Sequence, residues 1–169
     1  MTLRPAKPTD ASSIAAISIE VWIGTYLKNG VNAFFADYAL EEFTVEKTAK
    51  LISDPSHVLL VSENEDGIDG FIRVSFANPA PVPGCSDIEI STFYVQPRHH
   101  GKGIGKRLLG AALQHCRGAG ADSVWLATNA ENDPAIGFYL AQGFAHVGET
   151  HFRIDEQAYL NNVYSLRLE

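Results

Sequence analysis

The stretch that decides the fold is "IEISTFYVQPRHHGKGIGKRLLG", residues 88–110, in which a β-branched and aromatic run meets a glycine-rich, cationic loop. Residues 88–95 are typical of a central strand, because β-branched and aromatic side chains suit a pleated, buried surface. Beyond the loop, apolar residues recur at the spacing of one helix face; they are Ile104, Leu108, Leu109, Ala112, Leu113 and Cys116. The stretch therefore predicts a strand, a glycine loop and a helix in succession.

The loop concentrates positive charge in a chain that is otherwise acidic. The 169 residues carry a net charge of −7, whereas the segment 98–107 gathers most of its side chains from the basic types: Arg98, His99, His100, Lys102, Lys106 and Arg107. Glycines let the backbone approach a ligand closely, and free amides at a helix N-terminus bind phosphate oxygens. We therefore expect the loop to bind a compact polyanion.

Neither of the two common nucleotide-binding loops matches these glycines. A P-loop needs Gly, four residues, Gly-Lys and then Ser or Thr. Counting back from Gly105 places His100 at the first glycine, and Arg107 replaces the hydroxyl residue. A dinucleotide-binding loop needs Gly-x-Gly-x-x-Gly, but its third glycine would fall on Lys106 or Leu108. Both interpretations are excluded.

The rest of the chain predicts one mixed domain, residues 1–169, without repeats. Further strands are expected at 2–6, 57–64, 70–77, 123–128, 144–148 and 163–168, and further helices after Asp10 and at 31–43, 45–54 and 134–142. Asp10 and Asp133 are the predicted N-caps of the first and last helices. The strand 123–128 should lie parallel to 88–95, because a helical crossover separates the two.

Composition excludes several classes of protein. A net charge of −7 argues against nucleic acid as the main partner. No apolar run approaches the roughly 20 residues of a membrane span, and the first ten residues lack a signal-peptide core, so we expect no membrane association and a cytoplasmic location. Cys85 and Cys116 have no paired spacing. His99 and His100 have no Cys or carboxylate at ligand spacing, so no metal site is predicted.

Two motifs resemble the GNAT superfamily of N-acetyltransferases. The segment "VQPRHHGKGIGKRLL" resembles its acetyl-CoA pyrophosphate loop, with His100 at the usual Gln or Arg and glycines at 103 and 105. The segment "NDPAIGFYLAQGF" is similar to its second signature, an Asn before a short helix that bears a Tyr. The resemblance covers nearly the whole chain. It implies an α/β GNAT fold, in which helices flank a mostly antiparallel central sheet with one parallel, splayed strand pair.

The same resemblance implies acetyl-CoA as co-substrate, with no metal. The backbone of Phe93, Tyr94 and Val95 would bind the pantetheine, and the Val95 amide would polarise the thioester carbonyl. The pyrophosphate would lie on the loop residues His100, Gly101, Lys102, Gly103, Ile104, Gly105 and Lys106. Asn132 would either contact the pantetheine or cap the helix that follows it.

Two side chains are the candidates for proton transfer. Tyr139 resembles the family's general acid, which protonates the departing thiolate; its alternative is a purely packing role. Glu89 occupies the position of the catalytic Glu of the histone-acetyltransferase branch, and partial burial would raise its pKa toward that of a useful base acting through water. The alternative for Glu89 is an exposed strand residue. The branch of the family that acetylates the N-termini of ribosomal proteins has its general base where this chain has Ala127, which cannot accept a proton, so that mechanism is not expected here.

The resemblance implies transfer of an acetyl group to a primary amine of a small molecule, by direct attack in a ternary complex. A looser similarity of residues 21–26, 36–52 and 151–168 to the polyamine (spermine/spermidine) N-acetyltransferase branch suggests a polyamine. Trp22 and Tyr26, beside acidic residues such as Glu20, would bind the cation, or would simply be core. The alternatives are a protein or peptide N-acetyltransferase and a non-catalytic acetyl-CoA-binding module. The superfamily also suggests a homodimer.

Overall fold

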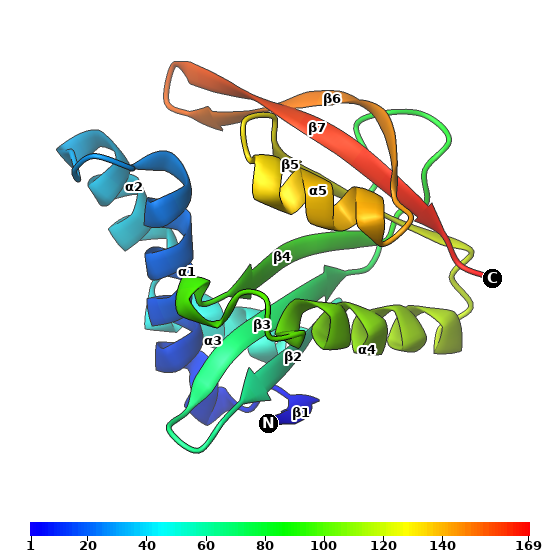
Figure 1. The fold of residues 1–169 in the computed structure, drawn as a ribbon, viewed down its shortest axis with the longest axis horizontal. Coiled ribbons are helices and arrows are strands. Elements are labelled where there is room, and N and C mark those ends of the chain that lie inside the picture. The colour runs from blue at the N-terminus through cyan, green and yellow to red at the C-terminus, as the bar shows by residue number, and fades with distance from the viewer. The chain divides into compact units, whose positions relative to one another are not determined.

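The computed structural model describes all residues, 1–169, as a mixed sheet with helices (Figure 1). The strands are β1 (Thr2–Pro5), β2 (His57–Glu63), β3 (Ile68–Ser75), β4 (Glu89–Val95), β5 (Ser123–Asn129), β6 (Ala145–Ile154) and β7 (Gln157–Arg167). The helices are α1 (Ala11–Tyr26), α2 (Ala33–Glu42), α3 (Val45–Ser53), α4 (Ile104–Gly118) and α5 (Asp133–Ala141), with short 3-10 turns at Pro8–Asp10 and Pro97–His99.

The strand order in the seven-stranded sheet is β1-β2-β3-β4-β5-β7-β6. β4 and β5 run parallel, with Glu89 opposite Trp125, and the Trp125 N–H donates to the Ile88 carbonyl at 2.9 Å. The segment 88–95 is therefore the middle strand, as predicted. The mixed α/β fold with one parallel pair confirms the expected fold class.

The chain divides into two compact units. Unit 1 comprises residues 1–74 and 92–112, and unit 2 comprises residues 75–91 and 113–169. β4 and α4 each contribute one part to either unit. The single domain over residues 1–169 stays a prediction, and the units are described in turn.

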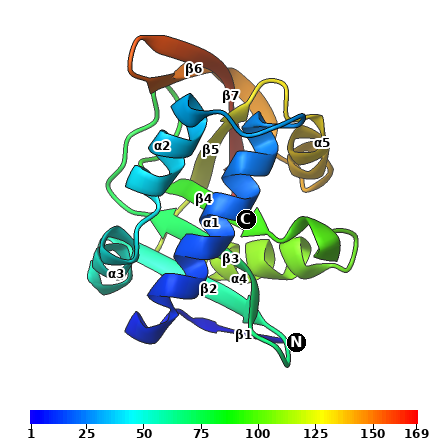
Figure 2. The ribbon, with the colours of Figure 1, turned by 90° about the vertical axis from the view of Figure 1, so that its left-hand side faces the viewer.

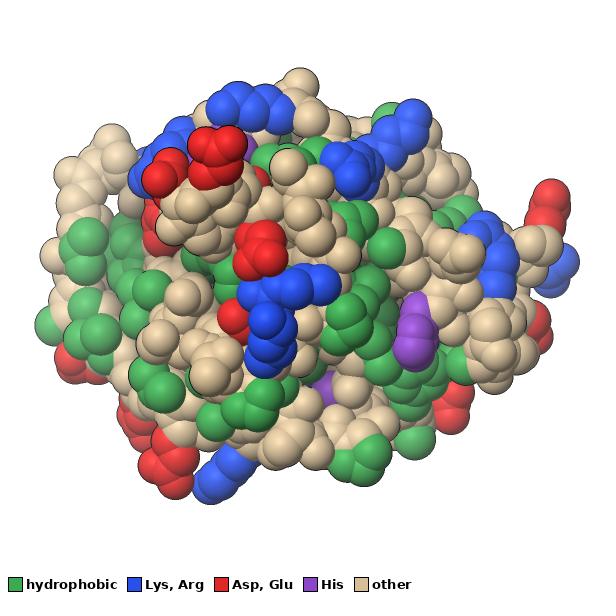
Figure 3. Space-filling model, turned by 90° about the horizontal axis from the view of Figure 1, so that it is seen from below, with side chains coloured by type: hydrophobic (Ala, Val, Ile, Leu, Met, Phe, Trp, Pro, Cys, Tyr) green, Lys and Arg blue, Asp and Glu red, His purple; other side chains and the backbone are tan.

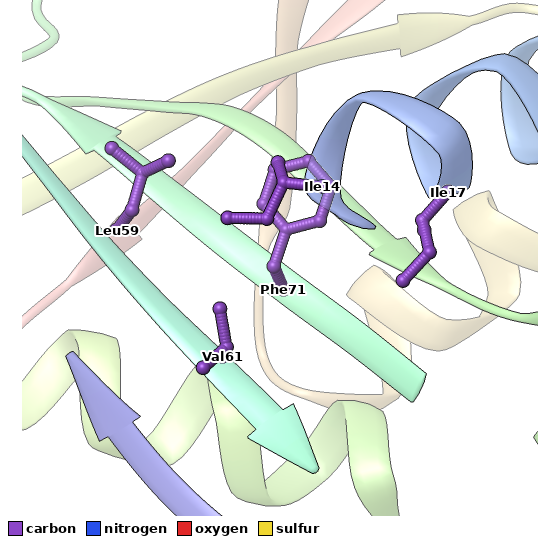
Figure 4. Close-up of a cluster of buried hydrophobic side chains, with 5 residues drawn as sticks. All are labelled: Ile14, Ile17, Leu59, Val61 and Phe71. Atoms are coloured by element: carbon purple, nitrogen blue, oxygen red, sulfur yellow. The ribbon is translucent and has the colours of Figure 1, made fainter. Parts of the chain in front are cut away.

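In unit 1, helices cover both faces of β2 and β3. A Cβ on Gly70 would lie 3.3 Å from Leu108 of α4, so this position of β3 faces α4. The next residue, Phe71, points to the opposite face because side chains alternate along a strand. There it packs with Ile14 and Ile17 of α1 (Figure 4). Figure 2 shows α1 and α3 on this same side of the strands.

Unit 2 is built on the antiparallel strands β5, β7 and β6. β5 and β7 pair continuously from Ser123↔Arg167 to Asn129↔Asn161, while β6 has a register shift between His146 and Gly148. A Cβ on Gly148 would lie 2.6 Å from the Val82 side chain, so only glycine fits this close approach. Val163 and Tyr164 of β7 are buried and form part of the core.

Three predictions about these elements were wrong in detail. The Asp10 carboxylate precedes α1 but accepts from Arg4 and from the Lys7 N–H, so it is diverted from the amides of α1. Asp133 is the first residue of α5, and Asn132 is its cap. β6 and β7 extend beyond the predicted 144–148 and 163–168. The sequence did not indicate the added residues 149–154 and 157–162 because most of them are polar, and all but Ile154 are exposed or half-exposed, so they lack the apolar signal of a buried strand.

On the face seen in Figure 3, acidic and basic side chains are interspersed with apolar ones. No helix combines the length and the apolar character that spanning a bilayer requires.

Candidate functional site

The glycine loop in unit 1 ends directly at the first residue of α4. Gly101 and Gly103 have φ angles of 80° and 81°, a left-handed conformation that L side chains rarely adopt. A Cβ at either position would meet nothing within 4 Å. These glycines are therefore required by the backbone path and leave the space above the loop open.

The first amides of α4 have no partner within the helix. The Arg107 N–H donates to the Gly103 carbonyl at 3.1 Å. The N–H groups of Ile104, Gly105 and Lys106 have no such acceptor, because the carbonyls four residues before them lie outside the helix. Gly103 has no side chain that could cap them. Because these amides lie at the positive end of the helix dipole, they form an anion-binding site.

His100 links the loop to the end of β4. Its ring Nε2 lies 3.0 Å from the Val95 carbonyl oxygen, and because a carbonyl can only accept, the imidazole donates from Nε2. Next to it, the Lys102 ammonium donates to His99 Nδ1 at 3.0 Å. At the one position where the loop departs from the family pattern, the side chain therefore bonds to the strand end.

Three residues that hold the loop against α1 were not recognised from the sequence. Gln96 Nε2 and Arg98 Nη2 donate to the two carboxylate oxygens of Glu20, at 3.0 and 3.1 Å. The Gln96 N–H also donates to the Asp69 carbonyl at 2.9 Å. Glu20, which the sequence places among the acidic residues near the amine-binding aromatics, instead anchors the start of the loop. No local pattern indicates a contact between helix α1 and a segment some 76 residues later.

β4 presents the residues assigned to the pantetheine. Tyr94 lies edge-on to Phe71, with ring centroids 5.8 Å apart. Burial raises the pKa of Tyr94 far above the usual tyrosine range, so its phenol is neutral at physiological pH. A Cβ on Gly70 would contact the Val95 side chain at 3.2 Å and the Tyr94 carbonyl at 3.0 Å. The C-terminal part of β4 is thus packed closely against β3.

Glu89 lies in unit 2, half-buried near the start of β4. One carboxylate oxygen, Oε2, accepts from the Asn78 side-chain amide and from the Ser91 hydroxyl, the latter at 3.0 Å. Asn78 is itself fixed, because its backbone carbonyl accepts from Trp125 Nε1 at 3.0 Å and its backbone N–H donates to the Asp87 backbone carbonyl at 2.7 Å. The Glu89 carboxylate is therefore oriented by its neighbours.

Asn132 and Tyr139 lie at the two ends of α5 in unit 2. Asn132 Oδ1 accepts from the Ala135 N–H at 3.4 Å, so the side chain caps the helix. Tyr139 is buried among aromatic rings, 5.6 Å from Phe144 and 6.4 Å from Tyr164 between centroids. The ring of Tyr139 therefore has a packing role. Its role as general acid concerns the hydroxyl group and stays a prediction.

The predicted amine-binding aromatics form a cluster in unit 1. Trp22 is 6% exposed, and its ring lies 4.7 Å from Tyr26 and 4.9 Å from Tyr38 between centroids. Burial, followed by the charge of Glu42, raises the pKa of Tyr38 to about 12. Trp22 is thus largely a core residue, whereas Tyr26 is half-exposed.

Unit 1 brings together Phe93, Tyr94, Val95, His100 and the loop 101–106, and unit 2 contains Glu89, Asn132 and Tyr139. The β4 and loop residues assigned to acetyl-CoA therefore belong to unit 1, whereas Asn132 and the candidates for proton transfer belong to unit 2. Each group is ordered by contacts within its own unit.

Comparison with known proteins identifies the class. The sequence profile of the acetyltransferase (GNAT) family matches residues 25–144. A crystal structure of PaiA N-acetyltransferase from Thermoplasma acidophilum in complex with coenzyme A has the same fold, with a TM-score of 0.76 over 99% of both chains at 21% identity. The chain belongs to the GNAT family.

Curated relatives agree with this assignment. An uncharacterised N-acetyltransferase of Mycobacterium tuberculosis is 25% identical over 146 residues, covering 86% of this chain and 90% of that protein. Streptothricin acetyltransferase of Streptomyces lavendulae is 29% identical over 160 residues, covering 86% of this chain and 82% of that protein. The chain is an acetyl-CoA-dependent N-acetyltransferase.

Proposed function

We propose that the chain transfers the acetyl group of acetyl-CoA to a primary amine of a small molecule, by direct attack in a ternary complex. The observation that carries this proposal is the open, uncapped N-terminus of α4 behind Gly101 and Gly103. The small-molecule class is supported by streptothricin acetyltransferase, a relative whose name gives such an acceptor and which aligns with 86% of this chain.

The residues around the loop fit the phosphates of acetyl-CoA. The amides of residues 101–106 would bind the pyrophosphate oxygens, because they combine backbone donors, the helix dipole and left-handed glycines that leave room for the ligand. Lys102 and Lys106, both exposed, add positive charge. His100 would act indirectly, by holding the loop to Val95.

Acetyl-CoA supplies the activated acetyl thioester. We assign the Val95 N–H to the developing negative charge on the thioester oxygen. The Tyr139 hydroxyl would return a proton to the leaving sulfur. A thiol with a pKa near 8.5 is already a fair leaving group, so this assistance is modest.

Glu89 is assigned to remove the proton of the incoming amine. A primary amine has a pKa near 10.4 and is mostly protonated at neutral pH, so it must lose a proton before it attacks. The Glu89 carboxylate, held through Oε2 by Asn78 and Ser91, would accept that proton through a water molecule.

A screen of candidate acceptors, which includes polyamines, tests the proposal. Thiol release from acetyl-CoA should be measured over polyamines, amino acids, aminoglycosides and peptides. We expect release with free small amines. Release with peptides alone would replace the proposal by protein or peptide N-acetylation, and no release above background with any free amine would overturn it.

Variants then test the assigned roles. Tyr139→Phe keeps the buried ring, so we expect kcat to fall about tenfold, below the range typical of general acid catalysis, while the Kd for acetyl-CoA stays unchanged. Glu89→Gln should lower the rate most at low pH, where the neutral amine is rarest. An unchanged kcat for the first variant, or a wild-type pH profile for the second, would remove that residue from the mechanism.

A further inference from the structure

Unit 1 contains a pocket of about 350 Å³ that none of the roles above uses. It lies between α1, α3 and the strands β2, β3 and β4, and a volume of this size suits a small ligand. One part of its wall is apolar, with Ile14, Leu59 and Phe71 from the unit 1 core and Phe43 and Leu51 beside them. Figure 4 shows Ile14 and Phe71 side by side and Leu59 near them.

Two polar residues from neighbouring strands also line this pocket. Arg73 of β3 donates to the Thr92 hydroxyl of β4 through Nε at 3.4 Å and Nη2 at 3.2 Å. The contact orients the guanidinium within the pocket lining. A guanidinium held in a defined orientation can bind a carboxylate through two parallel hydrogen bonds, which an ammonium cannot do.

The pocket lining contains more basic than acidic residues. Three are basic, namely Lys47, Lys50 and Arg73, and two are acidic, Glu42 and Asp54. Both acids and both lysines are already engaged within the protein. Glu42 lies 3.6 Å from Lys47, and Lys50 lies 3.4 Å from Glu46. Asp54 accepts from the N–H and the hydroxyl of Ser56 at 2.9 and 2.7 Å. With three basic residues against two acidic ones, the lining keeps a net positive charge, which favours an anionic group over a cationic one.

Two neighbouring groups respond to the positive charge of Arg73. Burial and then the charge of Arg73 lower the pKa of His57, although Asp54 acts in the opposite direction. Burial raises the pKa of Tyr94, and the charge of Arg73 opposes that rise. Arg73 thus lowers the pKa of both groups, as expected of a cation, which disfavours the positively charged form of His57 and favours the negatively charged form of Tyr94.

Thr92 also relates the pocket to the proposed chemistry. It lies in β4 three residues before Val95, a rise of roughly 10 Å at the usual strand spacing. A ligand whose acidic end contacts Arg73 would have to extend about this far along β4 to bring its amine to the proposed thioester contact. An acceptor amine would need to be separated from its acidic group by several bonds.

We propose that this pocket binds the carboxylate end of the acceptor, so that the favoured substrates are amphipathic ω-amino carboxylates with an apolar chain rather than polyamines. The inference rests on the proposed function and specifies its substrate class. Arg73 and Thr92 are the specificity-determining residues, and the apolar part of the wall accommodates the chain between the amine and the carboxylate.

Three acceptors of the same chain length test the inference: 6-aminohexanoate, hexylamine and 1,6-diaminohexane. They present a carboxylate, a methyl group and an ammonium to the pocket. We expect kcat/KM for 6-aminohexanoate to exceed that for the diamine at least tenfold. Equal values, or a preference for the diamine, would overturn the inference while leaving amine acetylation intact.

Variants show whether Arg73 is responsible. Arg73→Gln should abolish the preference for the carboxylate, Arg73→Lys should retain part of it, and Thr92→Val should weaken it by releasing the guanidinium. Arg117→Gln removes a positive charge that does not line the pocket and should leave the ratio as in wild type. A full preference in Arg73→Gln would overturn the assignment. Arg73→Lys provides the test if Arg73→Gln does not fold.

A binding measurement separates this inference from the proposed function. Hexanoate and hexylamine, each titrated without acetyl-CoA, report on the pocket even if no acceptor releases thiol. We expect hexanoate to bind more tightly to the wild type and to lose at least tenfold in affinity in Arg73→Gln. Tighter binding of hexylamine to the wild type would contradict the inference.

Discussion

The N-termini of α4 and α5, the first in unit 1 and the second in unit 2, are built in opposite ways. α4 in unit 1 follows Gly103, which has no side chain, whereas α5 in unit 2 follows Asn132, whose Oδ1 accepts from the Ala135 N–H. The first amides of any α-helix lack intrahelical partners. At α5 the side chain of the preceding residue is such a partner, whereas at α4 a bound ligand or solvent must accept from the free amides. This difference favours α4 as the end that binds an anion.

Two other helices of unit 1 begin with ordinary side-chain caps. Asn32 accepts from the Phe35 N–H at 3.1 Å and caps α2, and Thr44 accepts from the Lys47 N–H at 3.2 Å and caps α3. α1 lacks such a cap because the Asp10 carboxylate is bonded to Arg4 and to the Lys7 N–H. Before α4, the left-handed Gly101 and Gly103 stand in place of a capping side chain and leave the first amides of the helix accessible.

The largest effect on this comparison should come from Gly103→Ala. Gly103 has a φ of 81°, and an L residue in the left-handed region costs about 1–2 kcal/mol. Relief of that strain would turn the neighbouring peptide planes and misalign the α4 amides. We expect the Kd for acetyl-CoA to rise about tenfold, equivalent to about 1.4 kcal/mol, as measured by titration calorimetry.

Gly110→Ala is the matched control for that variant. A Cβ at Gly110 also meets nothing within 4 Å, but Gly110 lies inside α4 without a left-handed φ. Alanine there should raise the free energy of unfolding by about 0.5–1 kcal/mol and leave acetyl-CoA binding unchanged. If both variants weakened binding equally, the backbone argument for Gly103 would be wrong.

This contrast also explains how much the sequence could predict. The strand, loop and helix at 88–110 depend on consecutive residues, and the predicted α4 stripe is buried, with Leu108, Ala112 and Cys116 fully inaccessible. The excluded P-loop and dinucleotide loop likewise required only counting. Local backbone features, including the parallel β4–β5 pair that a helical crossover implies, were therefore predictable.

Side-chain partners were predicted less well, because they depend on contacts between distant segments. Glu89 is held by Asn78, which comes from the preceding loop, and the start of the glycine loop is held by Glu20 of α1. Asp10 is an acceptable cap by residue type, yet Arg4 diverts it. Arg73 was missed although a charged residue within the buried run 70–75 was a visible signal.

The second effect in size concerns the capped helix. Asn132→Ala removes the acceptor for the Ala135 N–H, and loss of such a cap typically costs about 1 kcal/mol of unfolding free energy. We expect that loss in chemical denaturation, with the Kd for acetyl-CoA unchanged. Asn132→Asp keeps an acceptor oxygen and should restore the stability. If both variants instead weakened acetyl-CoA binding, Asn132 would be a pantetheine contact rather than only a cap.

The smallest effect concerns α1, whose preceding carboxylate is diverted. Arg4 binds Asp10 at 2.7 Å and Glu63 at 2.9 Å, and these hydrogen bonds lower the pKa of both carboxyl groups. A carboxyl group whose pKa is lower in the folded state contributes stability above its unfolded pKa, and that contribution is lost as the pH falls through the folded value.

Arg4→Met should therefore be less stable than the wild type near neutral pH, and the difference should shrink below about pH 4, the ordinary range of carboxyl pKa values. The effect is small because these side chains are partly exposed to solvent. Denaturation at pH 7, 5, 4 and 3 measures it. A difference that stayed constant over this range would mean that Arg4 stabilises the start of α1 through packing of its stem, and that the diverted carboxylate of Asp10 contributes no pH-dependent stability.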